Sequence, residues 1–199
     1  QRQMCIRDSV WSESGQHTGR TDIPLTAVGE QQAADAGRRL REAFPEGFSQ
    51  SCVFSSPLKR ACQTAELAGF ADHGVLDGIA EWDYGRAEGR TRQQVSEASG
   101  FEWDVWRDGP RSLTPTLEGD WVETLPSGEQ VPVHAGPGET LEEAAARAKS
   151  AIDEITPLLH AIRTGDQSAA ARLYALLYPE IKRLAHSRLY AVGGVTSLN

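Results

Sequence analysis

One stretch decides the fold expected of this chain: Ser55-Ser56-Pro57-Leu58-Lys59-Arg60-Ala61-Cys62-Gln63-Thr64-Ala65. It follows a short apolar run, Cys52-Val53-Phe54, that predicts a buried strand. Ser56 suits the N-cap of a helix and Pro57 suits its first position. A helix that begins directly after a strand presents backbone N–H groups and a positive dipole end to an anion. Arg60, in its first turn, adds a guanidinium that can hold phosphate with two hydrogen bonds.

The same stretch is also compatible with an ordinary strand–helix junction that carries a surface arginine. Two further stretches bear on this choice, Trp11-Ser12-Glu13-Ser14-Gly15-Gln16-His17-Thr18-Gly19-Arg20-Thr21-Asp22-Ile23-Pro24-Leu25-Thr26 and Glu81-Trp82-Asp83-Tyr84-Gly85-Arg86-Ala87-Glu88-Gly89. With the first stretch, they resemble the histidine phosphatase superfamily over about residues 10–155. The resemblance implies an α/β fold, here an incomplete phosphoglycerate-mutase-like three-layer sandwich with a short helical C-terminal tail.

Composition restricts the class of protein further. The chain has 199 residues, 39% of them apolar, which is enough for one good core or a domain with a small appendage. It has no run of about 18 apolar residues that would span a membrane, and no apolar segment of a signal peptide at its start. Cys5, Cys52 and Cys62 lack the spacing of metal ligands. We therefore expect reduced thiols, a cytoplasmic location, no metal and no cofactor.

The charge is unevenly distributed along the chain. The net charge is −8, and the segment from Ile155 onward carries five basic and two acidic residues. An acidic body argues against nucleic acid binding there, whereas a basic tail suggests a module with a different partner. The tail contains the stretches Leu158-Leu159-His160-Ala161-Ile162-Arg163-Thr164-Gly165-Asp166, Ala169-Ala170-Ala171-Arg172-Leu173-Tyr174 and Ile181-Lys182-Arg183-Leu184-Ala185-His186. With these stretches, residues 156–199 resemble the start of an extracytoplasmic-function sigma factor, which implies RNA polymerase as a partner. An amphipathic tail without that function is the alternative.

Helix signals place several elements along the chain. Residues 11–26 are expected to form a polar loop, and Thr26 to begin a helix that closes before Pro45. A short apolar run, Val75-Leu76, comes before Glu81, and a weak helix covers Thr91 to Ser99.

Residues 107–138 form a segment rich in proline, glycine and polar residues. Within it, residues 121–125 and 130–133 flank a turn and predict a β-hairpin, with Pro132 at an edge position. In the family, an insertion at this point forms a cap beside the active site.

Thr140 followed by Glu143 predicts a capping box that starts another helix. Pro157 is expected to kink or end it. In the tail, Asp166 is a suitable N-cap for the first of two further amphipathic helices, which Pro179 separates.

The resemblance also assigns roles to residues. Arg60 matches the second of two arginines that line the phosphate pocket in the family. Glu81 matches the general acid that protonates the leaving alcohol, a role that requires a raised pKa at neutral pH. Trp82 beside it could help to exclude water. A surface glutamate before a turn is the alternative for Glu81.

Other loop residues match substrate contacts of the family. Thr18 and Gly19 match residues that donate backbone or hydroxyl hydrogen bonds to substrate, and Tyr84 matches a substrate-contacting position. Ser12 stands where many relatives have an asparagine against the phosphate, and its hydroxyl could still donate. His17 is expected to be a solvated loop histidine.

The chain departs from the family at the nucleophile. Arg7-Asp8-Ser9-Val10 stands before Trp11, where the family has Arg-His-Gly. The second catalytic histidine of the family is also missing, because no His-Gly pair follows an apolar strand downstream. His134 is expected to lie exposed in the hairpin loop, and His160 and His186 to lie on helices. Residues 1–9 have no periodicity and are interpreted as a non-native leader.

The leading interpretation is a histidine phosphatase domain over residues 10–155 that acts on small phosphomonoesters. Intact relatives form a phosphohistidine, and this chain as written is expected to be inactive. A non-catalytic, transcription-associated protein that acts through its tail is the first alternative, and a chimeric fragment without function is the second. The sequence separates neither phosphatase from mutase nor one oligomeric state from another.

Overall fold

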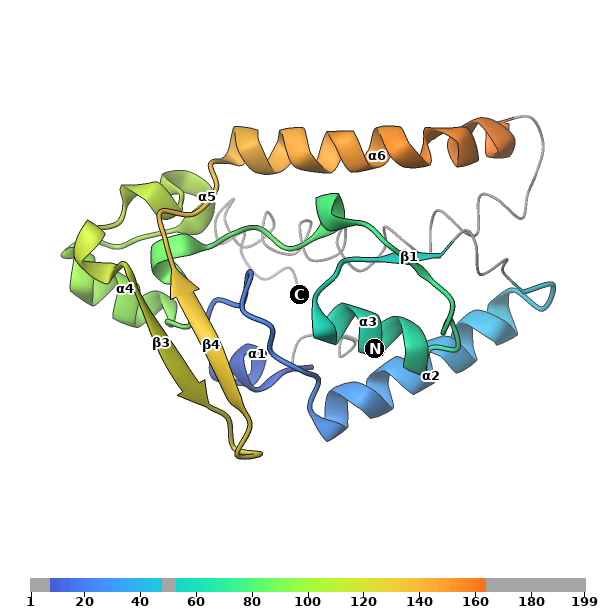
Figure 1. The fold of residues 1–199 in the computed structure, drawn as a ribbon, viewed down its shortest axis with the longest axis horizontal. Coiled ribbons are helices and arrows are strands. Elements are labelled where there is room, and N and C mark those ends of the chain that lie inside the picture. The colour runs from blue at the N-terminus through green and yellow to red at the C-terminus, as the bar shows by residue number, and fades with distance from the viewer. Residues whose placement is uncertain (1–7, 48–52, 164–199) are drawn as a thin grey trace, which may run out of the picture.

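A computed structural model describes residues 8–47 and 53–163 (Figure 1). Its helices are α1 (Val10–Ser14), α2 (Ala27–Ala43), α3 (Lys59–Leu67), α4 (Arg92–Ser99), α5 (Val105–Asp108) and α6 (Leu141–Arg163). Single 3-10 turns are η2 (Asp77–Ile79), η3 (Gly85–Ala87), η4 (Pro110–Ser112) and η5 (Pro115–Leu117). The strands are β1 (Phe54–Ser55), β2 (Gly74–Val75), β3 (Gly119–Thr124) and β4 (Gln130–Ala135). The expected leader up to residue 7 and the tail helices from Asp166 onward lie outside the described residues.

A parallel strand pair joined by a helix gives the α/β character of the fold. β1 pairs with β2 in parallel, with Phe54 opposite Gly74, and α3 connects the two strands. The backbone N–H of Gly74 donates to the carbonyl of Val53 at 2.7 Å. Val53 is buried, as predicted, but it precedes the strand, and Cys52 is not among the described residues.

The start of α3 differs from the prediction. Ser56 and Pro57 precede the helix, and Leu58 is the N-cap without a side-chain cap hydrogen bond. A carboxylate from another segment replaces the missing cap, since the N–H of Lys59 donates to Asp22. A helix start that depends on a residue distant in the sequence leaves no local signal. α3 ends at Leu67, with Ala68 as its C-cap and Gly69 following at a φ of 99°.

Two other helix starts lie in the N-terminal part. Residues 10–14 are helical rather than part of a loop, because Ser9 and Ser12 form a reciprocal capping box. The expected start after Thr26 is confirmed, and the Thr26 hydroxyl accepts from the N–H of Gly29 at 3.1 Å. α4 likewise follows Thr91 as predicted, with a capping box of its own.

The predicted hairpin is present and is longer than expected. β3 and β4 pair antiparallel, with Val122 opposite Pro132. Val131 and Val133 of β4 are buried while Pro132 and His134 are exposed, which is the alternation of a strand with one face on the core. His134 is therefore on a strand and not in the loop, although its expected exposure is correct.

The segment predicted as a cap contributes to two core clusters. One contains Trp11, Ile23, Leu125, Val131 and Val133. The other contains Ala87, Val95, Trp103, Leu113 and Leu117. Residues 107–138 supply members of both clusters, so this segment packs into the body of the protein.

α6 begins as predicted but does not stop at Pro157. The Thr140 N–H donates to Glu143 at 2.8 Å, and the Glu143 N–H donates to the Thr140 hydroxyl at 3.2 Å. The helix then continues through Pro157 to Arg163. An interior proline costs about 3 kcal/mol. A long helix that is capped at its start and buries Ala151 and Ile155 can tolerate that cost.

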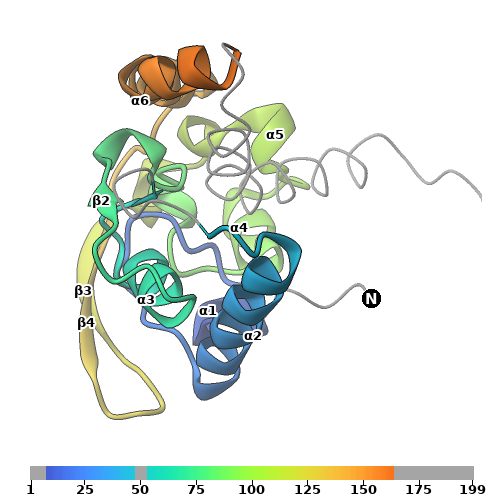
Figure 2. The ribbon, with the colours of Figure 1, turned by 90° about the vertical axis from the view of Figure 1, so that its right-hand side faces the viewer.

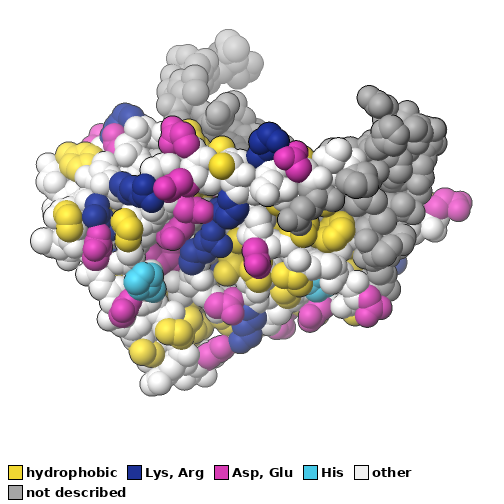
Figure 3. Space-filling view, turned by 45° about the horizontal axis from the view of Figure 1, so that its top comes forward, with side chains coloured by type: hydrophobic (Ala, Val, Ile, Leu, Met, Phe, Trp, Pro, Cys, Tyr) yellow, Lys and Arg dark blue, Asp and Glu magenta, His cyan; other side chains and the backbone are white. Residues whose placement is uncertain are grey.

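The helices and the hairpin are arranged around the paired strands β1 and β2. In Figures 1 and 2, α6 runs along one side, α2 and α3 lie side by side on the opposite side, and the β3–β4 hairpin closes one end. Figure 3 shows acidic and basic side chains next to one another on the face that it presents. None of the helices in the described ranges is long and apolar enough to cross a membrane.

Candidate functional site

Arg60 lies in the first turn of α3 and reaches the loop of residues 18–21. Its Nη1 donates to the carbonyl of Thr21 at 3.0 Å. Its Nη2 donates to the carbonyls of Thr18 and Gly19 at 3.2 and 2.9 Å. The guanidinium is thus held in a defined orientation at the N-terminal end of α3, where the helix dipole also favours an anion.

The expected acid, Glu81, contacts the expected substrate residue Tyr84. The Tyr84 hydroxyl donates to Oε1 of Glu81 at 3.2 Å. Trp82, the next residue, is buried, and its indole N–H donates to the carbonyl of Glu139 at 2.9 Å. The structure thus places the carboxylate of Glu81 against the phenol of Tyr84.

The segment that carries Glu81 and the side chain of Arg60 both contact Gly19. A Cβ at this position would lie 2.4 Å from the Trp82 carbonyl oxygen and 3.0 Å from Cδ2 of Tyr84. Gly19 thus contacts the segment that carries Glu81, and its carbonyl accepts from Arg60. Three segments far apart in the sequence therefore meet here, as the sequence motifs predict.

The remaining expected contacts have other partners in this structure. The N–H of Gly19 donates to Glu88, at 3.0 Å to Oε1 and 3.1 Å to Oε2. The Thr18 hydroxyl donates to the carbonyl of Gln16 at 3.2 Å. The Ser12 hydroxyl belongs to the α1 capping box, donating to the Ser9 carbonyl at 2.7 Å. Ser12 therefore stabilises a local helix start in this structure.

His17 differs from the expected solvated side chain. Its ring packs edge-on against Tyr84 and Trp103, with centroids 5.2 Å away in both cases. Nδ1 lies 2.7 Å from the Arg90 carbonyl, so this nitrogen carries the hydrogen. Burial lowers the pKa of His17, although the Arg90 carbonyl opposes the shift. His17 is thus neutral and packs with Tyr84 and Trp103 next to the site.

Two residues that the sequence reasoning did not select hold the Glu81 segment. Arg147 of α6 donates to the carbonyls of Gly78, Ala80 and Glu81 at 2.9, 2.8 and 3.3 Å. The same guanidinium pairs with Glu139 through two hydrogen bonds of 2.7 Å. An arginine six residues into a predicted helix carries no local sign of such contacts.

Glu139 connects this clamp to the first loop. It forms an ion pair with Arg20 at 3.3 Å and accepts from the N–H of Asp83 at 3.0 Å. Burial acts to raise its pKa, but the hydrogen bonds from Arg147 and Asp83 and the charges of Arg147 and Arg20 outweigh burial, so the pKa is lowered. Glu139 therefore remains ionised and keeps the loop, the Glu81 segment and α6 together.

His134, which the sequence analysis singled out, does not join the site. His134 is exposed on β4 and pairs with Asp120. His160 lies within α6 as expected, and His186 is outside the described residues. Among the described residues, no group of three or more His, Cys, Asp or Glu side chains could hold a metal ion.

Comparison with known proteins identifies the family. Residues 8–161 match the family model of the histidine phosphatase superfamily (branch 1). This match covers most of the chain, and the chain belongs to that superfamily. Residues 152–196 separately match the family model of the ECF sigma factors.

Curated relatives include phosphatases and mutases. The chain is 40% identical over 102 residues to an acid phosphatase of Mycobacterium tuberculosis, covering 51% of this chain and 48% of that one. It is 35% identical over 117 residues to the sedoheptulose 1,7-bisphosphatase of Saccharomyces cerevisiae, covering 50% and 43%. The chain thus spans about half the length of these relatives.

Solved structures support the fold. A structure of an open reading frame product from Mycobacterium tuberculosis matches with a TM-score of 0.55 at 31% identity, covering 75% of this chain and 63% of that one. A putative alpha-ribazole-5'-P phosphatase from Escherichia coli also has a TM-score of 0.55, at 20% identity and coverages of 78% and 66%. The expected phosphoglycerate-mutase-like α/β fold is therefore confirmed.

Proposed function

We propose that this chain binds the phosphate group of small phosphomonoesters at Arg60 and the N-terminal end of α3. The observation that carries the proposal is the fixed guanidinium of Arg60 next to the Gly19 contact with the Glu81 segment. A guanidinium that is already oriented loses little conformational entropy when it binds an anion. Membership of the superfamily and the phosphatases among the relatives support phosphate as the ligand.

We further propose that bound ester is not hydrolysed by the chain as written. A phosphohistidine requires a histidine at the family position, and residues 7–10 are Arg-Asp-Ser-Val. Loss of a nucleophile from a covalent-catalysis enzyme reduces turnover by about 10⁶-fold. Glu81 retains the position of an acid for the leaving oxygen. Binding without turnover is compatible with either a phosphatase or a mutase ancestry.

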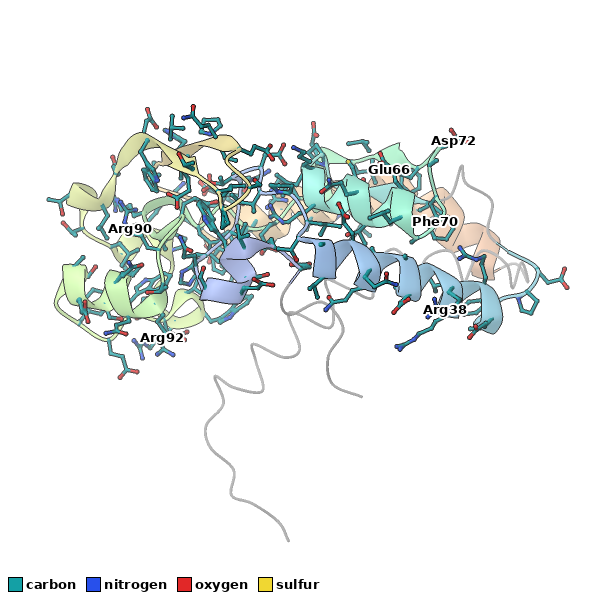
Figure 4. All side chains as sticks on the ribbon, turned by 90° about the horizontal axis from the view of Figure 1, so that it is seen from below. Arg38, Glu66, Phe70, Asp72, Arg90 and Arg92 are labelled. Carbon is teal, nitrogen blue, oxygen red and sulfur yellow. The ribbon has the colours of Figure 1, made fainter. Side chains whose placement is uncertain are left out.

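A titration with inorganic phosphate, followed by NMR of the labelled chain, tests the binding proposal. We expect Arg60→Ala to weaken phosphate binding by at least about tenfold, because charge-assisted hydrogen bonds contribute about 1.5–3 kcal/mol. Arg38→Ala is the matched control, since Arg38 projects from α2 into solvent and, among the described residues, pairs with neighbouring Asp35 (Figure 4). Equal affinity of both variants would refute the role of Arg60.

A hydrolysis assay tests the proposed inactivity. Release of phosphate from a generic phosphomonoester above background, lost in Arg60→Ala, would refute it.

A second candidate function rests on the match of residues 152–196 to the ECF sigma factors. Under this proposal residues 156–199 form a second module that contacts RNA polymerase. The net charge of the segment from Ile155 onward, with five basic and two acidic residues, differs in sign from that of the whole chain. We expect the tagged full chain to capture purified bacterial RNA polymerase. Capture that is unchanged after removal of the tail would exclude this module as the contact.

A further inference from the structure

Glu88 is a buried carboxylate that the proposed chemistry does not use. It follows η3 and is 1% exposed. Its Oε1 accepts from the N–H groups of Gly19 and Thr21 at 3.0 and 2.9 Å, and its Oε2 accepts from Gly19 at 3.1 Å. An isolated buried carboxylate is costly, so these bonds account for how the fold accommodates it. All three involve the loop that Arg60 contacts.

Glu88 and Arg60 hold opposite sides of this loop. In the peptide group between Thr18 and Gly19, the carbonyl accepts from Arg60 and the N–H donates to Glu88. These two groups point in opposite directions in a trans peptide. Thr21 bonds to the same two side chains through successive peptide groups, with its N–H on Glu88 and its carbonyl on Arg60. The loop is therefore fixed between a carboxylate and a guanidinium, and hydrogen bonds to charged groups are the strong ones.

The packing leaves the loop little alternative. A Cβ at Gly19 would lie 2.8 Å from Oε2 of Glu88, so only glycine allows this approach. Next to the loop, His17 and Glu88 pair in an isolated parallel β-bridge, and the Gly89 N–H donates to the His17 carbonyl at 2.9 Å. The backbone that follows Glu88 is thus anchored to His17, next to the same loop.

The charges around Glu88 make its ionisation sensitive to these bonds. Burial raises the pKa of Glu88, the N–H groups of Thr21 and Gly19 oppose the shift, and the charge of Asp83 adds to it. Arg60 faces the carboxylate across the loop, and His17 beside it is neutral because burial lowers its pKa. When Glu88 is protonated, the N–H groups of Gly19 and Thr21 face a neutral carboxylic acid instead of a carboxylate.

We propose that Glu88 is the positioning residue of the phosphate site: its carboxylate fixes the Thr18–Thr21 loop, and the loop carbonyls in turn orient the guanidinium of Arg60 for an anion. This inference rests on the proposed phosphate binding. Glu88 itself does not touch the ligand. Its effect on affinity passes through the backbone of Gly19 and Thr21 to Arg60.

The first test uses the unaltered chain and the pH dependence of its NMR signals. The side-chain carboxyl carbon of Glu88 reports its ionisation, and the amide signals of Gly19 and Thr21 report the acceptor that they face. We expect the three signals to shift with one common midpoint. Amide signals of Gly19 and Thr21 that do not follow Glu88 would overturn the proposal.

The second test compares two variants of similar size. Glu88→Gln keeps a carbonyl oxygen that can accept from Gly19 and Thr21, whereas Glu88→Leu fills the space without an acceptor. We expect Glu88→Leu to lower the exchange protection of both amides by about tenfold and to weaken phosphate binding by a similar factor. Glu88→Gln should keep most of the amide protection and most of the phosphate affinity of the wild type. Glu97→Gln is the matched control, since Glu97 is exposed on α4 and accepts a hydrogen bond from Gln93 of the same helix.

The outcomes separate the two proposals. If phosphate does not perturb the signals of the unaltered chain, the proposed function fails, and the amide measurements still decide whether Glu88 holds the loop. If phosphate binds and Glu88→Leu matches the wild type in protection and affinity, the function stands and the positioning role is refuted. If Glu88→Leu does not fold, the common midpoint and Glu88→Gln decide.

Discussion

At the scale of single residues, position in the fold gives the same side-chain type different roles. Glu81, Glu88 and Glu139 all border one site, yet each has different partners. Glu81 accepts from a phenol, Glu88 from backbone N–H groups, and Glu139 from two arginines. Burial dominates for Glu88, whose pKa is raised, and cationic partners outweigh it for Glu139, whose pKa is lowered. A motif match alone would not have distinguished these environments.

His17 leads to a prediction about pH. Its pKa is lowered in the fold by burial, so the folded chain binds fewer protons here than the unfolded chain. The contribution of His17 to the free energy of unfolding is therefore fully present above an unfolded-state pKa of about 6.5, declines below it, and is lost as pH falls through the lowered pKa of the folded state. Urea unfolding between about pH 5 and 8 measures this.

The variant His17→Phe keeps a ring between Tyr84 and Trp103 but cannot titrate. We expect it to lower stability by about 1 kcal/mol at neutral pH, because the hydrogen bond to the Arg90 carbonyl is lost. The difference in stability between wild type and His17→Phe should shrink as pH falls. A difference that is constant over the whole range would contradict the assignment of a buried, neutral His17.

At the scale of elements, helix starts were predictable where the cap is local. Thr26, Thr91 and Thr140 each cap the helix that follows them, because their hydroxyls accept from an N–H three residues later. The start of α3 was misplaced by two residues because its first N–H bonds to Asp22, which no local pattern reveals. Local chemistry predicts an element when its partners are local.

Pro157 leads to a prediction about the stability of α6. It lacks the N–H that would bond to the carbonyl four residues earlier, yet α6 continues past it. We expect Pro157→Ala to raise the free energy of unfolding by about 1–3 kcal/mol, since it restores that bond and improves helix propensity. Far-UV circular dichroism during urea unfolding measures the change. Thr156→Ala, at an exposed neighbouring position, is the control that leaves the backbone donors unaltered; stabilisation in both variants alike would argue against the backbone explanation.

At the scale of the whole molecule, packing brings together residues that the sequence separates widely. Gly37 of α2 approaches α3 so closely that a Cβ would lie 2.3 Å from the Ala68 carbonyl oxygen. A Cβ at Gly78 would lie 2.6 Å from the Cβ of Ala151 in α6. These contacts place α2, α3 and α6 around the segments that carry Arg60 and Glu81. The segment interpreted as a cap supplies members of both core clusters. Val131 and Val133 of β4 face one cluster, and Leu113 and Leu117 pack in the other.

The sequence by itself determined the superfamily, the main helix starts, the hairpin, and Arg60 and Glu81 as candidate site residues. Those signals are local: a hydroxyl before a helix, an alternating strand, a short motif. Only the tertiary structure decided that Arg60 is oriented by loop carbonyls, that Glu88 fixes that loop from the other side, and that Arg147 clamps the Glu81 segment. The physical reason is that these contacts join side chains to backbone groups tens of residues away, and a backbone carbonyl or N–H looks the same at every position of a sequence.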